Sequence, residues 1–195
     1  MKDISADTKQ KTILAAAWKV FAAYGYRKTS MNDIAVSAGM SRPALYLHYR
    51  NKQDVFRSLA QYYHDKSVAA VGNALAEPGP VAEVLASAFA AQGGDVIEAM
   101  LSSPHGMELL DTGSILAADI VAASQAQLGG LFTDWLNAQA RAGRARLTAP
   151  ADELAGTITA ALKGIKMTGA DYATYKARVA HLAAMIGAGL ATTAR

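Results

Sequence analysis

The sequence predicts an all-α protein, and three observations carry this prediction. Alanine, which has the highest helix propensity, fills 43 of the 195 positions. Apolar residues recur with a helical period along most of the chain, and capping residues and glycines stand where helices should begin and end. We expect an N-terminal three-helix helix-turn-helix head, residues 1–51, joined by a long helix to a C-terminal helical bundle within residues 52–195.

The first two helices of the head have clear boundaries in the sequence. Residues 8–24 contain neither proline nor glycine and repeat apolar residues on one helical face, and Gly25 follows as a stop. Ser30 and Asp33 then have the spacing of a capping box, in which the serine oxygen accepts from the first turn and the acid reaches back. This pattern predicts a short second helix over residues 31–38.

The next two helices complete a helix-turn-helix arrangement. Ser41 is an N-cap residue, and Pro43 lies in the first turn of a helix expected over residues 42–49, where its missing N–H costs little. Asn51 caps a long fourth helix that runs to about Leu75. Two short helices separated by a turn with glycine, behind one helix and ahead of a long one, are typical of this motif.

A break at residues 77–80, Glu-Pro-Gly-Pro, separates the head and its long helix from the rest of the chain. Beyond this break, apolar periodicity predicts six more helices that form the bundle. Their expected ranges are 81–92, 95–102, 104–110, 114–142, 151–167 and 171–193.

Charge is distributed unevenly along the chain. Residues 1–66 hold 11 Lys and Arg against 5 Asp and Glu, a net charge of +6, whereas residues 67–195 carry −3. Such an asymmetry favours contact between the N-terminal third and a polyanion, although chance alone also produces it.

Several classes of protein are excluded by composition. The absence of cysteine excludes disulfides, thiolate metal sites and a cysteine nucleophile. The polar N-terminus does not resemble a signal peptide, and the longest uncharged stretch of the second half, residues 120–133, is too short and polar to span a bilayer. We therefore expect a cytoplasmic protein.

Catalytic motifs are also missing. The sequence has no glycine-rich phosphate loop, nucleophile elbow or paired-histidine zinc helix. His105 could join Glu108 and Asp111 in an acid–base or metal site, but no second histidine or cysteine lies nearby. We expect no enzyme, no metal and no cofactor.

One face of the third helix carries the functional signal. Helical geometry points Leu45 and Tyr49 inward together, so the outward face presents Arg, Pro, Leu and Tyr but no acid. An exposed Leu47 is unusual toward water but suits a DNA major groove, where Arg bonds guanine edges and apolar side chains meet thymine methyl groups. The residues expected at or near base edges are Arg42, Pro43, Ala44 and Leu47.

Groups suited to phosphates surround this helix. Hydroxyl and lysine contacts, together with helix N-termini, position a protein on DNA without reading its sequence. The same residues would also stand at these positions if the serines only capped helices and the histidine were only solvated. The residues expected to contact phosphates are Thr29, Ser30, Ser41, Tyr46, His48 and Lys52.

Residues 29–35, residues 38–49, and the following Lys52 and Phe56 resemble the DNA-binding head of the tetracycline-repressor (TetR) family. The resemblance spans about residues 8–60. It implies an all-helical homodimer whose paired heads bind a palindromic operator and whose C-terminal domain binds a small molecule that lowers DNA affinity. Matched by position, it implies backbone contacts for Thr29, Ser41, Tyr46, His48 and Lys52, and places Arg42, Pro43, Ala44 and Leu47 at base edges. The chain departs from the family pattern at Leu47, where polar or aromatic residues are frequent, and at Tyr49, where Phe is common.

Bulky apolar residues of the middle helices are candidates for an effector pocket. Methionine and aromatic walls adapt to a hydrophobic compound, although the same residues would equally form a core. The ligand-binding candidates are Tyr62, Phe89, Met100, His105, Met107, Phe132 and Trp135, with Tyr63 and Leu101 beside them. Four acids that could meet a cationic compound, or be solvated, are Asp95, Glu98, Glu108 and Asp111.

Small residues repeat every four positions on the last two expected helices. Such stripes let helices approach closely, either within the chain or, as the resemblance implies, in a four-helix dimer interface. The stripes consist of Gly156, Ala160 and Gly164, and of Ala180, Ala184 and Ala188 with Leu182, Ile186 and Leu190 alongside.

These expectations combine into one hypothesis. The chain is a sequence-specific DNA-binding transcriptional regulator, a repressor released from its operator when a largely hydrophobic effector shifts the helix that begins near Lys52. The alternative is an architectural DNA-binding protein that responds to no effector.

Overall fold

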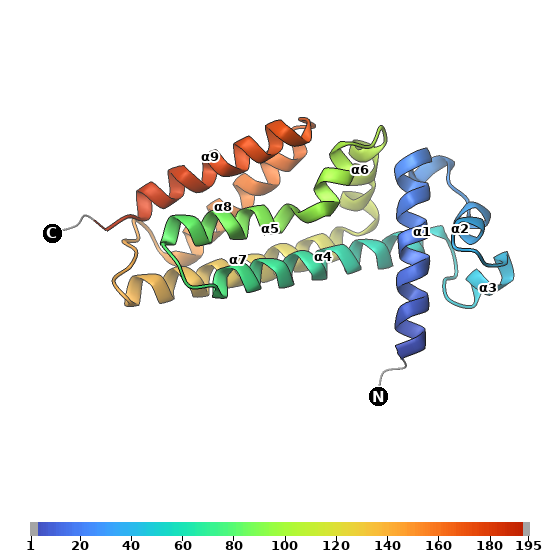
Figure 1. Cartoon of the computed structure of the whole chain (residues 1–195), viewed down its shortest axis with the longest axis horizontal. Helices are drawn as coiled ribbons and strands as arrows, with labels where there is room; N and C mark the ends of the chain where they lie inside the picture. The colour runs from blue at the N-terminus through green and yellow to red at the C-terminus, as the bar shows by residue number, and fades with distance from the viewer. Residues whose placement is uncertain (1–3, 193–195) are drawn as a thin grey trace. The chain divides into compact units, whose positions relative to one another are not determined.

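The structure is a computed structural model that describes residues 4–192, and within that range the chain forms nine helices and no strand (Figure 1). The all-α prediction is confirmed. The helices are α1 (Ile4–Lys28), α2 (Met31–Ser37), α3 (Arg42–Tyr46), α4 (Lys52–Ala76), α5 (Val81–Leu101), α6 (Gly106–Leu116), α7 (Ala118–Arg141), α8 (Ala151–Met167) and α9 (Tyr172–Leu190).

Packing divides the chain into two compact units. The first unit runs to Tyr63 and also takes in Ala99–Val121, and the second comprises His64–Glu98 and the chain from Ala122 onward. The long helix α4 therefore has residues in both units. The sequence predicts a boundary between a DNA-binding domain and a ligand-binding domain at residues 51 and 52. The two packing units meet elsewhere in the chain, so this functional boundary stays a prediction.

The first unit is built on a core shared by α1, α2, α3 and the start of α4. Phe21, Ile34 and Leu45 are fully buried, and α6 adds Leu109 to the same core. The rings of Phe21 and Phe56 meet edge-on with centroids 5.6 Å apart, a favoured aromatic geometry. This core fixes α2 and α3 against α1 as a helix-turn-helix (Figure 1).

The predicted caps of the head helices are confirmed. The Ser30 backbone N–H donates to Asp33 Oδ2 over 2.8 Å, and the Asp33 N–H donates to Ser30 Oγ over 3.3 Å. Ser41 Oγ accepts from the Ala44 N–H at 3.3 Å. Asn51 Oδ1 accepts from a first-turn N–H of α4 at 2.9 Å. Local hydrogen bonds therefore set where α2, α3 and α4 begin.

Two ends of the head helices differ from the expected ones. Helix α3 stops at Tyr46, three residues early, because the N–H groups of Leu47 and His48 donate to carbonyls three residues back in a tight turn. Helix α1 continues to Lys28, but Gly25 inside it has φ 78° and ψ 165°, so the chain bends at the expected stop.

The middle helices include both a confirmed break and a wrong one-helix prediction. Within α5, Gly94 has φ 54° and ψ −167°, so two helical segments meet there at a kink, in agreement with the expected separation of residues 81–92 from residues 95–102. The expected helix over residues 114–142 is wrong, because α6 ends at Leu116 and α7 begins at Ala118. Ala117 between them is fully buried, and residues 114–123 around the break contain neither Pro nor Gly.

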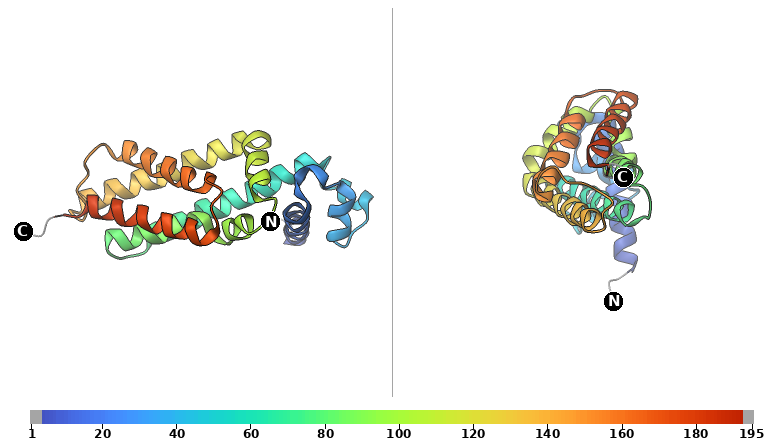
Figure 2. Two further views of the ribbon diagram at one scale, coloured as in Figure 1. Left: turned by 90° about the horizontal axis from the view of Figure 1, so that it is seen from above. Right: turned by 90° about the vertical axis from the view of Figure 1, so that its left-hand side faces the viewer.

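The second unit is a bundle of α5, α7, α8, α9 and the later part of α4. Phe89 and Phe132 are fully buried in its core, and their rings meet edge-on with centroids 5.7 Å apart. Helix α8 has the predicted bounds. Both views of Figure 2 show α8 in orange beside α9 in red, and this pair packs together.

Helix α5 is the one described helix that is long and apolar enough to cross a membrane by length and composition. Its apolar residues Val84, Leu85, Ala88 and Phe89 are buried inside the second unit. A core helix of a bundle has the same composition, and α5 has that place here.

Candidate nucleic-acid interface

The outward face of α3 and of the turn after it is apolar and basic. Leu47 is 86% exposed, whereas Leu45 is fully buried and Tyr49 is 7% exposed, as the helical geometry predicts. Ala44 is half-buried. The exposed residues here are Ser41, Arg42, Pro43, Tyr46, Leu47 and His48. An exposed surface without an acid and with a bare leucine at its centre matches the needs of a major groove.

Arg42 and Tyr46 support each other on this face. Arg42 Nη2 donates to Tyr46 Oη over 3.3 Å, and the guanidinium carbon lies 5.5 Å from the centre of the tyrosine ring. This cation–π contact holds the guanidinium against the helix. A guanidinium held in place loses less rotamer entropy when it binds a base.

The groups expected to contact phosphates lie in different environments. Thr29 is only 3% exposed, and its hydroxyl donates a hydrogen bond to the Gly25 carbonyl over 2.7 Å. Its side chain therefore stabilises the bend near the end of α1. Ser30 is exposed, and its hydrogen bonds to Asp33 hold the pKa of that carboxyl below its usual value. Ser41, which is also exposed, caps α3. The Thr29 hydroxyl is therefore engaged within the head, whereas a phosphate contact by this residue stays a prediction.

Lys52 is engaged within the protein. Its Nζ donates to the carbonyls of Tyr26 and Arg27 over 2.7 and 3.3 Å, and it lies 4.4 Å from the centre of the Tyr26 ring. Burial lowers the pKa of this ammonium, and the negative charge of Glu108 opposes the shift. The lysine therefore ties the start of α4 to the end of α1, a role that differs from the expected phosphate contact.

A contact between α1 and α6 adjoins this lysine. Glu108 Oε1 accepts from the Arg27 N–H at 3.1 Å, and Glu108 Oε2 lies 3.2 Å from His105 Nδ1. The hydrogen bond from Arg27 is the main reason that the pKa of Glu108 is lowered. A Cβ on Gly25 would collide with this carboxylate. Sequence reasoning missed this link, because the two partners are 81 residues apart.

Arg57 links α4 to the junction of α6 and α7. Its guanidinium donates to both carboxylate oxygens of Asp119, over 2.8 and 2.7 Å, and to the Leu116 carbonyl over 2.7 Å. The hydrogen bond from Arg57 is the main cause that lowers the pKa of Asp119 to about 2. A bidentate pair of this kind ties the first turns of α4 to the start of α7.

We expect Asp119 to titrate at about 2 in the intact protein and to return toward 3.8 in the Arg57→Gln variant. Because the folded-state pKa lies below the unfolded one, the stability from this pair is complete above the unfolded value and is lost as pH falls through about 2. Nuclear magnetic resonance of the side-chain carboxyl carbons measures this shift. Asp33 is the internal control, because its carboxylate is stabilised by Ser30 and not by Arg57, and its pKa should not change in the variant. An ordinary Asp119 pKa in the unmodified protein would contradict the assignment.

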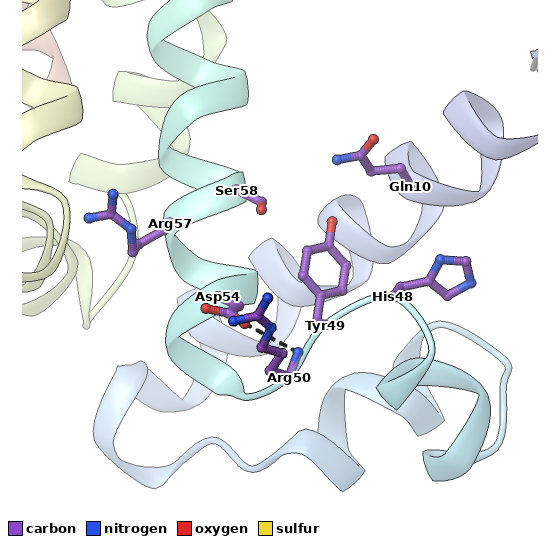
Figure 3. A pocket seen from close by; sticks show the side chains of 7 residues that line it. All are labelled: Gln10, His48, Tyr49, Arg50, Asp54, Arg57 and Ser58. Atoms are coloured by element: carbon purple, nitrogen blue, oxygen red, sulfur yellow. Dashed lines mark hydrogen bonds between the residues drawn. The ribbon is translucent and has the colours of Figure 1, made fainter. Parts of the chain in front are cut away.

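A polar pocket of about 560 Å³ lies in the head between α1, the turn after α3 and the start of α4 (Figure 3). Its lining residues are Gln10, His48, Tyr49, Arg50, Asp54, Arg57 and Ser58. Figure 3 shows the Tyr49 ring rising between Gln10 and Ser58. The Tyr49 hydroxyl is buried without a hydrogen bond of standard geometry, and burial raises its pKa. None of the effector candidates lines this pocket.

The seven effector candidates are divided between the two units. Phe89, Phe132 and Trp135 lie in the core of the second unit, whereas the other four lie in the first. His105 belongs to the contact between α1 and α6. The sequence pattern therefore combined core residues of two units, because periodicity alone does not distinguish a core from a pocket wall. The four in the first unit are Tyr62, Met100, His105 and Met107.

The residues of the small stripes are exposed. A Cβ added at Gly156 or Gly164 would meet nothing within 4 Å. Ile186 is half-buried. The exposed members are Gly156, Ala160 and Gly164 on α8, and Ala180, Ala184 and Ala188 on α9. Both stripes thus lie open to a partner.

Residues 13–59 match the sequence profile described as bacterial regulatory proteins of the tetR family. The matched residues begin within α1 and end within α4, so they include the whole helix-turn-helix. The predicted resemblance is confirmed over this segment.

Curated relatives and solved structures extend the likeness. The chain is 38% identical over 77 residues to an uncharacterized HTH-type transcriptional regulator of Bacillus subtilis, YezE, which is 40% of each chain. It is 28% identical over 177 residues to an HTH-type transcriptional repressor of Mycobacterium tuberculosis, which is 85% of this chain and 86% of that one. The chain matches only 22–40% of the length of the first three curated relatives.

A solved structure shares the fold of the whole chain. SmeT, the repressor of the Stenotrophomonas maltophilia multidrug efflux pump SmeDEF, has a TM-score of 0.66 at 18% identity, over 94% of this chain and 91% of SmeT. At this identity the likeness concerns the fold. Both this protein and the Mycobacterium tuberculosis relative are named as repressors.

Proposed function

We propose that the chain is a DNA-binding transcriptional regulator of the TetR family, and that it is a cytoplasmic homodimer that represses transcription from a palindromic operator. A small, largely hydrophobic molecule bound to the second unit releases it from DNA. SmeT has been solved in complex with triclosan, a precedent for binding of a small molecule by a protein of this fold.

The observation that carries the proposal is the recognition face of α3. Leu47 is 86% exposed at its centre, Arg42 is held beside Tyr46, and no acid interrupts the face. Leaving a large apolar side chain in water is unfavourable unless a partner covers it. A thymine methyl group and guanine edges are partners that fit these side chains.

The open stripes of α8 and α9 support dimerisation. Two copies that pack these stripes together by a two-fold axis form a four-helix interface and present two recognition helices. Two-fold related helices bind half-sites one helical turn apart, which is why a palindromic operator follows from a dimer.

The bonds at the start of α4 support coupling between effector and DNA. Helix α4 begins beside the recognition helix and continues into the second unit. Lys52 and Arg57 attach its first turns to α1 and to the start of α7. An effector that moves α4 would therefore move the head, and each ligand must weaken the binding of the other by the same factor.

Selection of bound duplexes from a random pool tests the proposal, followed by titration of the selected duplex at two salt concentrations. We expect a two-fold symmetric site bound by a dimer. Weak, sequence-indifferent and salt-sensitive binding would instead identify an architectural DNA-binding protein. An effector candidate must bind the free dimer more tightly than the operator-bound dimer; equal affinities contradict the proposed release.

A further inference from the structure

The polar pocket of the head is separate from every effector candidate. All of the residues that line it belong to the first unit, so one compact part of the chain builds it. Its volume of about 560 Å³ lies in the range of pockets that hold small organic ligands. Charged, amide, hydroxyl and imidazole groups make up most of the lining, so a polar compound suits this pocket better than an apolar one.

A buried hydroxyl in this pocket lacks a partner. Tyr49 is 7% exposed, and its ring belongs to the core of the first unit. The Oη atom is buried and has no hydrogen-bond partner among the described residues. A phenylalanine would pack the same ring without leaving a hydroxyl unpaired, which is costly in a core. Because buried polar groups are normally paired, this hydroxyl points to a partner that binds in the pocket.

Gln10 controls access to the hydroxyl of Tyr49. Its side chain is exposed on α1 and lies on one side of the tyrosine ring, and Ser58 on α4 lies on the other (Figure 3). Burial raises the pKa of Tyr49, and hydrogen bonding from Gln10 and Ser58 acts in the opposite direction, so both groups lie close to the hydroxyl. An exposed glutamine changes its rotamer readily. When Gln10 turns aside, the hydroxyl can donate to an acceptor atom of a ligand.

Arg50 brings a positive charge without a counter-ion to the same pocket. It is exposed, and its guanidinium forms no ion pair within the described part of the chain. The Asp54 carboxylate accepts from the backbone N–H of Arg50 instead, over 3.3 Å. Arg57, the other arginine of the lining, is held by Asp119. A guanidinium with its N–H groups available binds a phosphate through two parallel hydrogen bonds.

The remaining groups of the lining suit hydroxyls beside a phosphate. Asp54 and Ser58 are half-buried in the first turns of α4. Asp54 is the single acid of the lining, and its carboxylate repels a bare phosphate but accepts from a ligand hydroxyl. An arginine without a counter-ion together with a carboxylate acceptor therefore favours a ligand that carries both a phosphate and hydroxyl groups.

We propose that the pocket of the head is a second ligand site, which binds a small phosphorylated compound with hydroxyl groups, such as a sugar phosphate. Arg50 binds the phosphate, Asp54 accepts from a hydroxyl, and Tyr49 donates to a ligand oxygen. His48 also lines the pocket and is exposed on the turn after α3. A phosphate bound there places negative charge beside DNA, so it should lower operator affinity, a consequence that rests on the proposed function.

The test measures binding to the full-length protein, without DNA, by titration calorimetry. The probes are inorganic phosphate and the primary-hydroxyl phosphate esters of glycerol, ribose, glucose and adenosine, each ester beside its unphosphorylated parent. We expect at least one ester to bind about tenfold or more tightly than both its parent and inorganic phosphate. Arg50→Gln should remove this preference. Arg27→Gln changes an exposed arginine of the head outside the pocket and, as the matched control, should retain it.

A second variant tests the buried hydroxyl and guards against a folding defect. Tyr49→Phe should weaken binding of the ester and, without ligand, raise Tm, because it removes an unpaired polar group and keeps the ring. A variant that lost binding by misfolding would lower Tm instead. With the selected operator, the ester should raise the operator Kd of the unmodified protein and leave that of Arg50→Gln unchanged.

The proposal is overturned if no ester binds, if esters bind no more tightly than their parents or inorganic phosphate, or if Arg50→Gln and Arg27→Gln behave alike. It is also overturned if Arg50→Gln weakens operator binding alone, because Arg50 then contacts the phosphates of DNA. Operator selection is carried out without any ester, so this proposal and the proposed function fail separately.

Discussion

Replacing Leu47 with Asp is expected to weaken operator binding severely and leave the folded protein intact. The side chain is 86% exposed, so the change breaks no core contact and should alter stability by no more than about 0.5 kcal/mol. On DNA, each head loses the burial of a leucine side chain, worth about 1.5–3 kcal/mol where it is complete. Each head also gains a negative charge facing a polyanion. Because both heads of a two-fold dimer carry the substitution, the affinity of the dimer for its operator should fall by about two to four orders of magnitude.

Fluorescence anisotropy with the selected operator measures this loss, and circular dichroism confirms the fold. Ile115→Asp is the matched control, since Ile115 on α6 is a second apolar side chain, 75% exposed, and lies outside the helix-turn-helix. Leu47→Ala should show an intermediate loss, because it removes the contact without adding charge. Equal operator affinity of Leu47→Asp and the unmodified protein would mean that α3 does not enter the groove.

The parts of the head that sequence reasoning predicted are those fixed by local chemistry. Ser30 with Asp33, and Ser41 with Ala44, bond within three residues, so the sequence itself contains both partners of each cap. The inward direction of Leu45 follows from helical period in the same way. Where one short segment determines the structure, prediction and structure agree.

The interpretations that changed depend on residues far apart in the chain. Lys52 donates to Tyr26, 26 residues earlier, and Glu108 accepts from Arg27 across 81 residues. No local pattern contains such partners. One signal was present nonetheless: a lysine in the first turn of α4 lies at the positive end of the helix dipole, where a cation is unfavourable without another partner.

The break at Ala117 has a similar origin. The segment from Ser114 to Ala123 contains neither Pro nor Gly and continues the apolar period, so one long helix was the natural prediction. Instead, α6 adds Leu109 to the core of the first unit, and the Leu116 carbonyl accepts from Arg57. Tertiary contacts at the end of α6 therefore override local propensity.

Replacing Ala184 with Glu should split the dimer and, as a consequence, reduce operator affinity. Ala184 is exposed in the monomer, so the longer side chain fits an isolated copy without strain. In a two-fold interface made by the α8 and α9 stripes, two glutamates would be buried near the axis, where each unpaired charge costs several kcal/mol. We expect the dimerisation Kd to rise by about three orders of magnitude or more, from about 4 kcal/mol of lost free energy.

Sedimentation velocity across a concentration series measures this change, and Ala90→Glu, an exposed alanine on α5, is the matched control. The dependence of operator affinity on protein concentration distinguishes an interface defect from a folding defect. An interface defect lowers operator affinity most at low protein concentration, and raising the concentration recovers it, because mass action restores the dimer. A folding defect is not recovered in this way. If Ala184→Glu sediments as the unmodified dimer, the α8 and α9 stripes are not the interface, and the two recognition helices must be paired through another surface.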